Sequence, residues 1–498
     1  MRVLLVNPPY AADPLERRLG NYMPPLNLLY LAARLEKDGH AVKVLDLYAA
    51  PLSEEAALKA AADFGAELAG FATYSQNMPE VYALCRALKA RLPGVRTILG
   101  GLYASFLPEE CLNEASVDLA AAGEAEETLA ELAGGADPAG IKGLVLRGPG
   151  GAVRNPPRPL TADLDSLPPP AWHLADLDVY TLPPNRAVTR GRKASVLTSR
   201  GCAYRCSFCT HHYGYGGGSR LRGVPAVLAE IELLVRNYGV KELRFEDCTF
   251  TADPARVVAI CRGIRAAGLD LVWNCDVRCD TASDGLFAEM RAAGCRRVFI
   301  GVESASEKIL NSLAMKKGQH LDQARRAVAL ARRHGLRVTA SFVVGTPGET
   351  EETARETYAF ALELDPDYAM FSALVPSVGS ELFEKARREG KLDVRNYRGS
   401  HYLMLQSDRS GPVNLCEIPP ARLLELMEEF NTGFYRRPRY MLRRLFSARS
   451  ALELGQLFWG GLLVFRRKLP WVDAAAARLR EGPLRPRPQA RADMNPPR

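Results

Sequence analysis

Two series of short apolar runs alternate along this chain with amphipathic segments of helical period. In the first series the runs lie near residues 3–6, 41–47, 68–72, 95–99, 117–121 and 144–146, with helices such as 26–37 and 79–91 between them. Apolar strands separated by helices of this length form parallel sheets with both faces covered. Residues 1–147 therefore predict a doubly wound, Rossmann-like α/β domain, whose ligands bind at the carboxyl ends of the strands.

The second series predicts a different arrangement. Its apolar runs lie near residues 195–198, 242–246, 271–275, 298–302, 337–343 and 368–374, again with amphipathic helices between them. Six βα units are too few to close an eight-stranded barrel. Residues 193–395 therefore predict an open, partial (βα)6 TIM-like barrel, with its chemistry at the C-terminal strand ends.

The remaining segments have other compositions. Residues 148–192 are rich in proline, which does not allow long regular elements, and predict an ordered linker between the two domains. Residues 396–482 are expected to be helical, and residues 483–498 to form a disordered basic tail.

Charge and cysteine usage exclude several classes of protein. The net charge of +8 is misleading, because the last 63 residues carry 15 Lys and Arg but only 4 Asp and Glu. The basic character therefore belongs to the tail and does not indicate a nucleic-acid partner for the catalytic core. The 11 cysteines do not resemble a disulfide framework, so we expect a reducing, cytoplasmic location. The N-terminal apolar run is very short and predicts a first strand rather than a signal peptide.

Three cysteines lie within eight residues, directly after the first predicted barrel strand. Cys202, Cys206 and Cys209 have the spacing C-x3-C-x2-C. Three thiolates can bind three irons of a [4Fe–4S] cubane and leave the fourth iron open to an exogenous ligand. The alternative is a zinc site with His211 or His212 as the fourth ligand, but structural zinc sites usually pair two short clusters, and no second pair of this kind follows.

This segment resembles the radical S-adenosylmethionine (SAM) superfamily, in which an aromatic residue such as Phe208 typically precedes the third cysteine. The resemblance covers residues 195–375. It implies that SAM binds the open iron and that the polar and glycine-rich strand ends hold its other groups. The residues so implied are Glu246 and Asp247 for the amino group, Glu303 for the ribose, Gly345 and Pro347 for the adenine, and Phe208 and Ser341 for SAM without a specified group.

Each of these positions also has a plainer interpretation. Glu303 could be a carboxylate favoured at a helix N-terminus, and Gly345 could belong to an ordinary strand-to-helix turn. Cys248 stands where relatives often have a second aspartate after the second strand. Arg220 and Arg222 could contact SAM or the cluster, or could be solvated loop residues.

Two glycine turns follow adjacent strands of the first domain. Gly100 and Gly101 with Tyr103 follow the fourth strand, and Gly123 and Glu124 follow the fifth. Such turns open a slot for a flat or extended ligand, although tight turns alone would look the same. Together with Asn7-Pro8-Pro9, they resemble the cobalamin-binding half of the cobalamin-dependent radical SAM family. That resemblance implies that cobalamin contacts Gly100, Gly101, Tyr103, Gly123 and Glu124. Relatives often have histidine at the position of Tyr103, and no Asp-x-His-x-x-Gly motif supplies a cobalt ligand.

The C-terminal region has an apolar stretch, residues 457–465, followed by Arg466-Arg467-Lys468. It is too short to span a bilayer, which needs ~20 residues. One interpretation is a helix that lies at the anionic inner face of a membrane. The other is an amphipathic helix that packs over the substrate cleft.

The resemblance is to the class B radical SAM methyltransferases and also to the anaerobic magnesium-protoporphyrin monomethyl ester cyclase group. It implies methylation of an unactivated carbon, or of phosphorus, through a 5′-deoxyadenosyl radical and methylcobalamin. An oxidative cyclase or ring-rearranging enzyme is the alternative, and a cluster- and cobalamin-binding sensor or scaffold is the alternative outside enzymes. The partners expected are a small-molecule or lipid substrate and an electron donor such as flavodoxin or ferredoxin.

Overall fold

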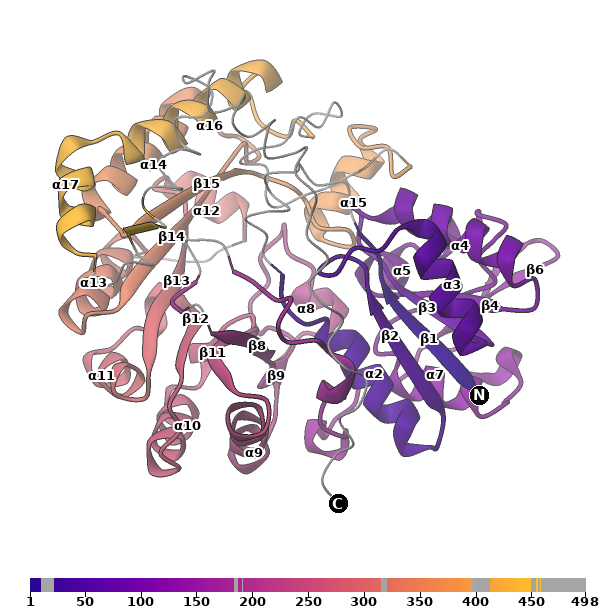
Figure 1. Cartoon of the computed structure of the whole chain (residues 1–498). Coiled ribbons are helices and arrows are strands. Elements are labelled where there is room, and N and C mark those ends of the chain that lie inside the picture. The colour runs from indigo at the N-terminus through magenta and orange to yellow at the C-terminus, as the bar shows by residue number, and fades with distance from the viewer. Residues whose placement is uncertain are drawn as a thin grey trace.

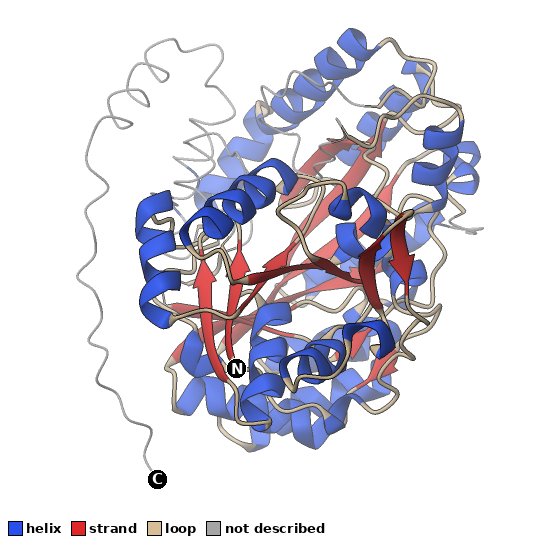
Figure 2. Cartoon of the chain, turned by 90° about the vertical axis from the view of Figure 1, so that its right-hand side faces the viewer, coloured by secondary structure: helices blue, strands red, loops and turns tan. Residues whose placement is uncertain are grey.

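The computed structural model describes residues 1–9, 22–182, 187–189, 191–314, 320–395, 397, 413–448, 454, 455 and 457. Two α/β domains lie next to each other, and two C-terminal helices pack on the second (Figure 1). Helices surround the strands of both sheets (Figure 2). The apolar tail from residue 458 onward and the basic residues after it lie outside the described residues.

The first domain is built on a seven-stranded sheet. Its inner strands are largely apolar because helices cover both faces, and all five residues of the third strand are buried. In sheet order the strands are β2 (Ala41–Asp46), β1 (Arg2–Asn7), β3 (Leu68–Ala72), β4 (Arg96–Gly100), β5 (Leu119–Ala121), β6 (Leu144–Gly148) and β7 (Gly151–Arg154). The helices are α2 (Leu26–Lys37), α3 (Glu54–Phe64), α4 (Met78–Arg91), α5 (Leu102–Phe106), α6 (Pro108–Leu112) and α7 (Glu126–Ala133).

Strands β1 to β5 are parallel, as predicted, but the far edge of the sheet differs. Strand β6 pairs antiparallel with β5, and β7 pairs antiparallel with β6. The expectation of a wholly parallel sheet is therefore wrong at this edge, and the sheet continues to Arg154, within the segment expected to be a linker. The short glycine-rich connection between Gly148 and Gly151 accounts for the direction of β7, because only antiparallel strands can be joined by so tight a turn. The direction of β6 depends on how the chain returns to the sheet after α7.

The second domain is the predicted open barrel of six parallel strands. In sheet order they are β15 (Tyr368–Ala373), β14 (Arg337–Val344), β13 (Cys295–Glu303), β12 (Val272–Arg278), β11 (Val240–Phe245) and β8 (Arg192–Val196). The helices between and after them are α9 (Val224–Arg236), α10 (Pro254–Ala266), α11 (Asp284–Ala292), α12 (Glu307–Ser312), α13 (His320–Arg333), α14 (Glu351–Leu364) and α15 (Glu381–Arg388).

Helix α16 (Pro420–Tyr435) covers the edge strand β15. The side-chain amide of Asn431 donates to the carbonyl of Phe371 at 3.0 Å and accepts from its N–H at 3.3 Å. The hydroxyl of Tyr435 donates to the carbonyl of Ala369 at 2.7 Å. These contacts satisfy backbone groups that an edge strand would otherwise expose to pairing with another chain.

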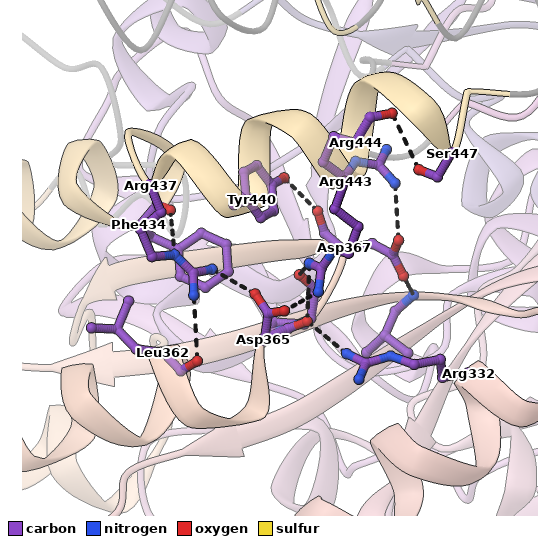
Figure 3. Close-up of polar contacts among 12 residues, drawn as sticks. Arg332, Leu362, Asp365, Asp367, Phe434, Arg437, Tyr440, Arg443, Arg444 and Ser447 are labelled. Carbon is purple, nitrogen blue, oxygen red and sulfur yellow. Dashed lines mark hydrogen bonds and ion pairs between the residues drawn. The ribbon is translucent and has the colours of Figure 1, made fainter.

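Helix α17 (Pro438–Phe446) is attached by arginines to two carboxylates at the start of β15 (Figure 3). Asp365 accepts from Arg437 at 2.7 Å and also pairs with Arg443, and Asp367 accepts from Arg444 at 2.9 Å. Part of the basic character of the C-terminal region is therefore neutralised within the fold. In the described part of the chain, no helix has both the length and the apolar character needed to cross a membrane.

Candidate active site

The three motif cysteines lie on the loop that follows β8, at the C-terminal side of the barrel sheet. All 11 cysteines of the chain are described, and none forms a disulfide. Cys202, Cys206 and Cys209 are half-buried. The short strands β9 (Ser199–Arg200) and β10 (Arg220–Leu221) pair antiparallel and close the base of this cluster loop, residues 201–219.

Backbone hydrogen bonds fix the middle of the cluster loop to the far side of the barrel. The N–H of Ser207 donates to the carbonyl of Leu313 at 3.0 Å, and the N–H of Leu382 donates to the carbonyl of Ser207 at 2.9 Å. Phe208 packs against the apolar group formed by Ile309, Leu310, Leu313, Leu374 and Leu382. Phe208, the aromatic residue before the third cysteine, therefore anchors the cluster loop to the segments that follow β13 and β15.

The thiols of the cluster cysteines lie near one another, near Cys248 and near the carboxylate of Glu303. Burial, together with the neighbouring thiols of Cys206 and Cys202 and the carboxylate of Glu303, raises the pKa of Cys209 to about 11. Burial and the thiols of Cys202 and Cys209 likewise raise the pKa of Cys248. Among the described residues, no three His, Cys, Asp or Glu side chains are arranged to hold a single metal ion.

The two carboxylates after β11 differ in their surroundings. Asp247 is 1% exposed and accepts from the backbone N–H of Thr198 at 3.2 Å, from its hydroxyl at 2.8 Å and from the hydroxyl of Ser199. It therefore supports the entry to the cluster loop, and its contact with SAM stays a prediction. Glu246 is more accessible, with 37% of its side chain exposed, and accepts from Ser195 at 3.1 Å.

Glu303 ends β13 in a conformation that is unusual for glutamate. Its φ is 65°, in the left-handed region, at a register shift between β13 and β14. A Cβ added to Gly301 would lie 2.5 Å from Oε1 of Glu303 and 3.9 Å from the hydroxyl oxygen of Ser341. The carboxylate therefore folds back over Gly301 toward Ser341. Such strained positions persist where the surrounding structure enforces them and cluster at functional sites.

The glycine turn after β14 is closed by a buried carboxylate. Glu349 accepts from the N–H of Gly345 at 2.5 Å and from the N–H of Thr346 at 2.9 Å. Gly345 has a φ of 90°, and a Cβ there would lie 2.8 Å from Leu423 of α16. The turn also contains the half-buried Pro347. Hydrogen bonds to Glu349 thus hold the turn, and Leu423 of α16 covers it.

In the first domain the glycine turn after β4 is bound to the end of β3. The N–H of Thr73 donates to the carbonyl of Gly100 at 2.7 Å, and its hydroxyl donates to the same carbonyl at 2.8 Å. Gly101 has a φ of 108°, and a Cβ there would lie 2.9 Å from the carbonyl oxygen of Thr73. Only glycine satisfies both conditions. Tyr103 is 5% exposed within the core of this domain, and its contact with cobalamin stays a prediction.

A serine hydroxyl joins the two glycine turns. Ser105 donates to the carbonyl of Gly101 at 2.8 Å and accepts from the N–H of Gly123 at 3.0 Å. A Cβ added to Gly100 or Gly123 would meet no atom within 4 Å, so both turns border open space. The turns therefore form one ledge with room for a ligand to approach the backbone closely.

Glu124, whose contact with cobalamin stays a prediction, faces the second domain. Its carboxylate binds Arg220 at 2.7 Å and Arg200 at 3.1 Å. Burial opposes its ionisation, yet the guanidinium groups of Arg220 and Arg200 hold the pKa of Glu124 below its usual value. Arg222 binds Glu230 at 2.5 Å, and its side chain is 8% exposed. Neither Arg220 nor Arg222 is therefore a solvated loop residue.

Helix α5 brings the glycine ledge against the cluster loop. A Cβ added to Gly214, in α8 (His211–Gly214), would lie 3.6 Å from the ring of Phe106 and 3.9 Å from Leu102. On its other side Phe106 lies so close to Gly379 that a Cβ there would overlap its ring. The ring thus lies between the cluster loop and the segment after β15, so α5, which follows the glycine ledge, adjoins the cluster loop.

Sequence reasoning missed three contributors to the site. Ser105 carries no motif, although a small polar residue four positions after a glycine turn is a suitable bridge. Glu349 directly follows the glycine turn, but nothing in the local sequence indicated that its carboxylate closes the turn. Arg278 lies over the ring of Tyr204 in the cluster loop, 3.5 Å from its centroid, and nothing in either local sequence indicated this pair.

Comparisons with known proteins agree with this geometry. Residues 14–133 match the B12 binding domain, and residues 196–361 match the radical SAM superfamily. An uncharacterized methyltransferase of Pyrococcus horikoshii is 32% identical over 452 residues, which cover 90% of this chain and 95% of that protein. The anaerobic magnesium-protoporphyrin IX monomethyl ester cyclase of Rubrivivax gelatinosus is 28% identical over 401 residues, which cover 77% of this chain and 70% of the cyclase.

A solved structure has the same fold. It is that of the radical SAM methyltransferase TsrM from Kitasatospora setae, with cobalamin and a [4Fe–4S] cluster bound. The TM-score is 0.64 at 24% identity, and the match covers 78% of this chain and 75% of TsrM.

Fold and site together define an enzyme that combines a cluster-bearing half-barrel with a corrinoid-binding α/β domain. The chain belongs to the radical SAM superfamily, in the group that carries an N-terminal B12-binding domain. Its cofactors are a [4Fe–4S] cluster, SAM and cobalamin. The described residues fit all three, because the cysteine loop supplies three thiols, Glu303 and Ser341 converge over Gly301, and the glycine ledge borders open space.

Proposed function

We propose that this enzyme transfers a methyl group from SAM to an unactivated carbon or phosphorus centre of a small-molecule or lipid substrate. The observation that carries the proposal is the close approach of Phe106 and Leu102, in the helix that follows Gly101, to Gly214 of the cluster loop, where a Cβ would lie 3.6 Å from the ring of Phe106. When bound, the cluster and SAM supply radical chemistry that breaks a substrate bond to hydrogen, and cobalamin supplies a carrier for the methyl group. Both must reach one positioned substrate, which requires adjoining sites.

The side chains of the barrel orient SAM in this proposal. Cys202, Cys206 and Cys209 hold the cluster through their thiolates. Glu303 and Ser341 receive the ribose hydroxyl groups. Hydrogen bonds to a charged acceptor such as the Glu303 carboxylate are the stronger ones. Glu246 faces the amino group, and the turn with Gly345 and Pro347 lies against the adenine, with Phe208 holding the loop below.

The first domain positions the corrinoid. Gly100, Gly101 and Gly123 let the ring approach the backbone closely, and Tyr103 stands below the ledge. The Pyrococcus horikoshii relative and TsrM, both named as methyltransferases, support transfer of a methyl group.

An assay without the substrate tests the proposal. The full chain is purified without oxygen, reconstituted with iron and sulfide, and supplied with cobalamin, SAM and a strong reductant. We expect S-adenosylhomocysteine in amounts that depend on cobalamin, with a cobalamin-free reaction as the control. Formation of 5′-deoxyadenosine without S-adenosylhomocysteine would reject methyl transfer. That outcome would favour the second candidate, an oxidative cyclase or ring-rearranging enzyme, which the Rubrivivax gelatinosus relative supports.

We further propose that a small cytoplasmic electron carrier such as flavodoxin or ferredoxin reduces the cluster. Replacing the chemical reductant with flavodoxin or with ferredoxin, each with its reductase and NADPH, tests this partner. SAM cleavage at a rate comparable to that with dithionite would support it. No cleavage with either carrier would reject it.

Peripheral contact with a membrane is the last part of the proposal. The arginines Arg437 and Arg443 bind Asp365, so support comes from the outer face of α17 instead. Its exposed apolar side chains are Met441, Leu442, Leu445 and Phe446, the last 83% exposed. Flotation with phosphatidylglycerol vesicles, compared for the wild type and Phe446→Asp, is the test. If both proteins remain entirely in the fraction without vesicles, membrane contact is rejected.

A further inference from the structure

The base of the cluster loop carries two arginines that face each other. Arg200 on β9 is the direct cross-strand partner of Arg220 on β10. Their side chains are only 9% and 17% exposed. Like charges directly opposite each other on paired strands are destabilising, and buried charges require partners. The loop that bears the cluster cysteines therefore closes only if carboxylates neutralise this pair.

The carboxylates come from the other domain. Glu124 binds both arginines, and Glu126 binds Nη2 of Arg200 at 2.7 Å. Glu124 lies in the turn after β5, directly after Gly123, and Glu126 is the first residue of α7. Two buried guanidinium groups thus meet two buried carboxylates across the domain boundary, with no net charge left over.

The carboxylate of Glu124 has no capacity left for another ligand. Oε1 accepts from Arg200 at 3.1 Å and from Arg220 at 2.7 Å, while Oε2 accepts from Arg220 at 2.9 Å and from the backbone N–H of Thr161 at 2.9 Å. A carboxylate offers about four acceptor positions, and all are used. Its side chain is 5% exposed, so a cofactor could reach it only by breaking these bonds.

Three more contacts hold the same junction together. Arg220 also donates to the carbonyl of Thr161 at 2.6 Å, which ties in the connecting segment between the domains. The guanidinium of Arg200 lies over the ring of Tyr30 of α2, 5.1 Å from its centroid, and the hydroxyl of Tyr30 accepts from Arg222 at 3.2 Å. The junction therefore joins the cobalamin domain, the connecting segment and both strands at the base of the cluster loop.

We propose that Glu124 is a positioning residue that sets the distance between the cluster and cobalamin by pinning the base of the cluster loop, and that it does not bind cobalamin itself. Arg200 is two residues before Cys202, so displacement of the pair moves the first cluster ligand. The inference rests on the proposed function only in assuming that both cofactors serve one substrate.

The test uses the full chain reconstituted with the cluster and cob(II)alamin. Pulsed dipolar electron paramagnetic resonance between the reduced cluster and Co(II) measures the distance between them without any turnover. We expect Glu124→Gln to keep its iron content and its cobalamin affinity, while the distance distribution broadens or shifts.

Glu131→Gln is the matched control, since Glu131 lies on the same helix and pairs with Arg158 at the surface. Its distance distribution should equal that of the wild type. Arg220→Gln is a second variant that leaves the pair of Arg200 with Glu126 intact, in case Glu124→Gln does not fold. It should shift the distribution in the same sense.

Two results would overturn the inference. Loss of cobalamin affinity in Glu124→Gln with an unchanged distance distribution would make Glu124 a cofactor ligand. If both Glu124→Gln and Arg220→Gln keep the wild-type distance distribution and bind cobalamin normally, the pairing of Glu124 with Arg220 has no positioning role. A shifted distribution in a protein whose wild type transfers no methyl group would reject the proposed function and keep this inference.

Discussion

Gly201 lies against the carbonyl oxygen of Gly218, so closely that a Cβ on Gly201 would overlap that oxygen. Gly201 also has a φ of 91° and is the residue directly before Cys202. This contact joins the two ends of the cluster loop just beyond the β9–β10 pair.

We therefore expect Gly201→Ala to lose most of its bound iron. The ends of the loop must move apart to make room for the alanine side chain, and the left-handed conformation is unfavourable for alanine. Iron and sulfide analysis with the visible absorbance of the reconstituted protein measures the loss. Gly285→Ala is the control, since a Cβ there meets no atom within 4 Å in α11. A full cluster in Gly201→Ala would contradict this account of the loop.

Glu303→Gln tests the predicted ribose contact. The amide keeps the size of the side chain but loses the charge, and a hydrogen bond to a charged group contributes about 1.5–3 kcal/mol. We expect the dissociation constant for SAM to rise by about tenfold or more, at unchanged iron content. Equilibrium dialysis of the cluster-bearing protein measures it, with Glu307→Gln, an exposed residue of α12, as the control. Equal affinities of the two variants would show that Glu303 does not bind SAM.

Ser105→Ala removes the hydroxyl that joins the two glycine turns. Because a net hydrogen bond contributes about 1 kcal/mol, we expect cobalamin to bind about threefold to tenfold more weakly. Titration of the protein with hydroxocobalamin, followed by its absorbance, gives the affinity. Ser116→Ala, at a hydroxyl that binds Glu114 away from the ledge, should bind cobalamin as the wild type does. A wild-type affinity for Ser105→Ala would mean that cobalamin does not rest on this ledge.

Asp365→Asn tests the attachment of α17. Asparagine tolerates the left-handed φ of 45° at this position, so the backbone is preserved while the charge that binds Arg437 and Arg443 is lost. We expect the free energy of unfolding to fall by about 2 kcal/mol and trypsin to cleave α17 faster. Thermal unfolding and limited proteolysis measure these effects. Glu363→Gln, which breaks an exposed pair with Arg325, is the control and should change neither.

Local patterns in the sequence were sufficient for the elements and for the cluster motif. The six barrel strands, the parallel strands of the first domain and the loop with Cys202, Cys206 and Cys209 follow from apolar periodicity and from spacing within a few residues. These features depend on backbone geometry and on short-range contacts, which neighbouring residues determine.

Only the tertiary structure decided which partners the charged residues have. Glu124 lies 76 residues from Arg200, Asp247 lies 48 from Ser199, and Asp365 lies 78 from Arg443. A buried charge requires a partner but does not indicate in sequence where the partner stands. The tertiary structure also decided that β6 and β7 are antiparallel at the edge of the first sheet, because strand direction depends on how the chain returns to the sheet. The sequence by itself therefore determined the elements, the cluster motif and the family resemblance, and the packing of the two domains decided that Glu124 faces the base of the cluster loop.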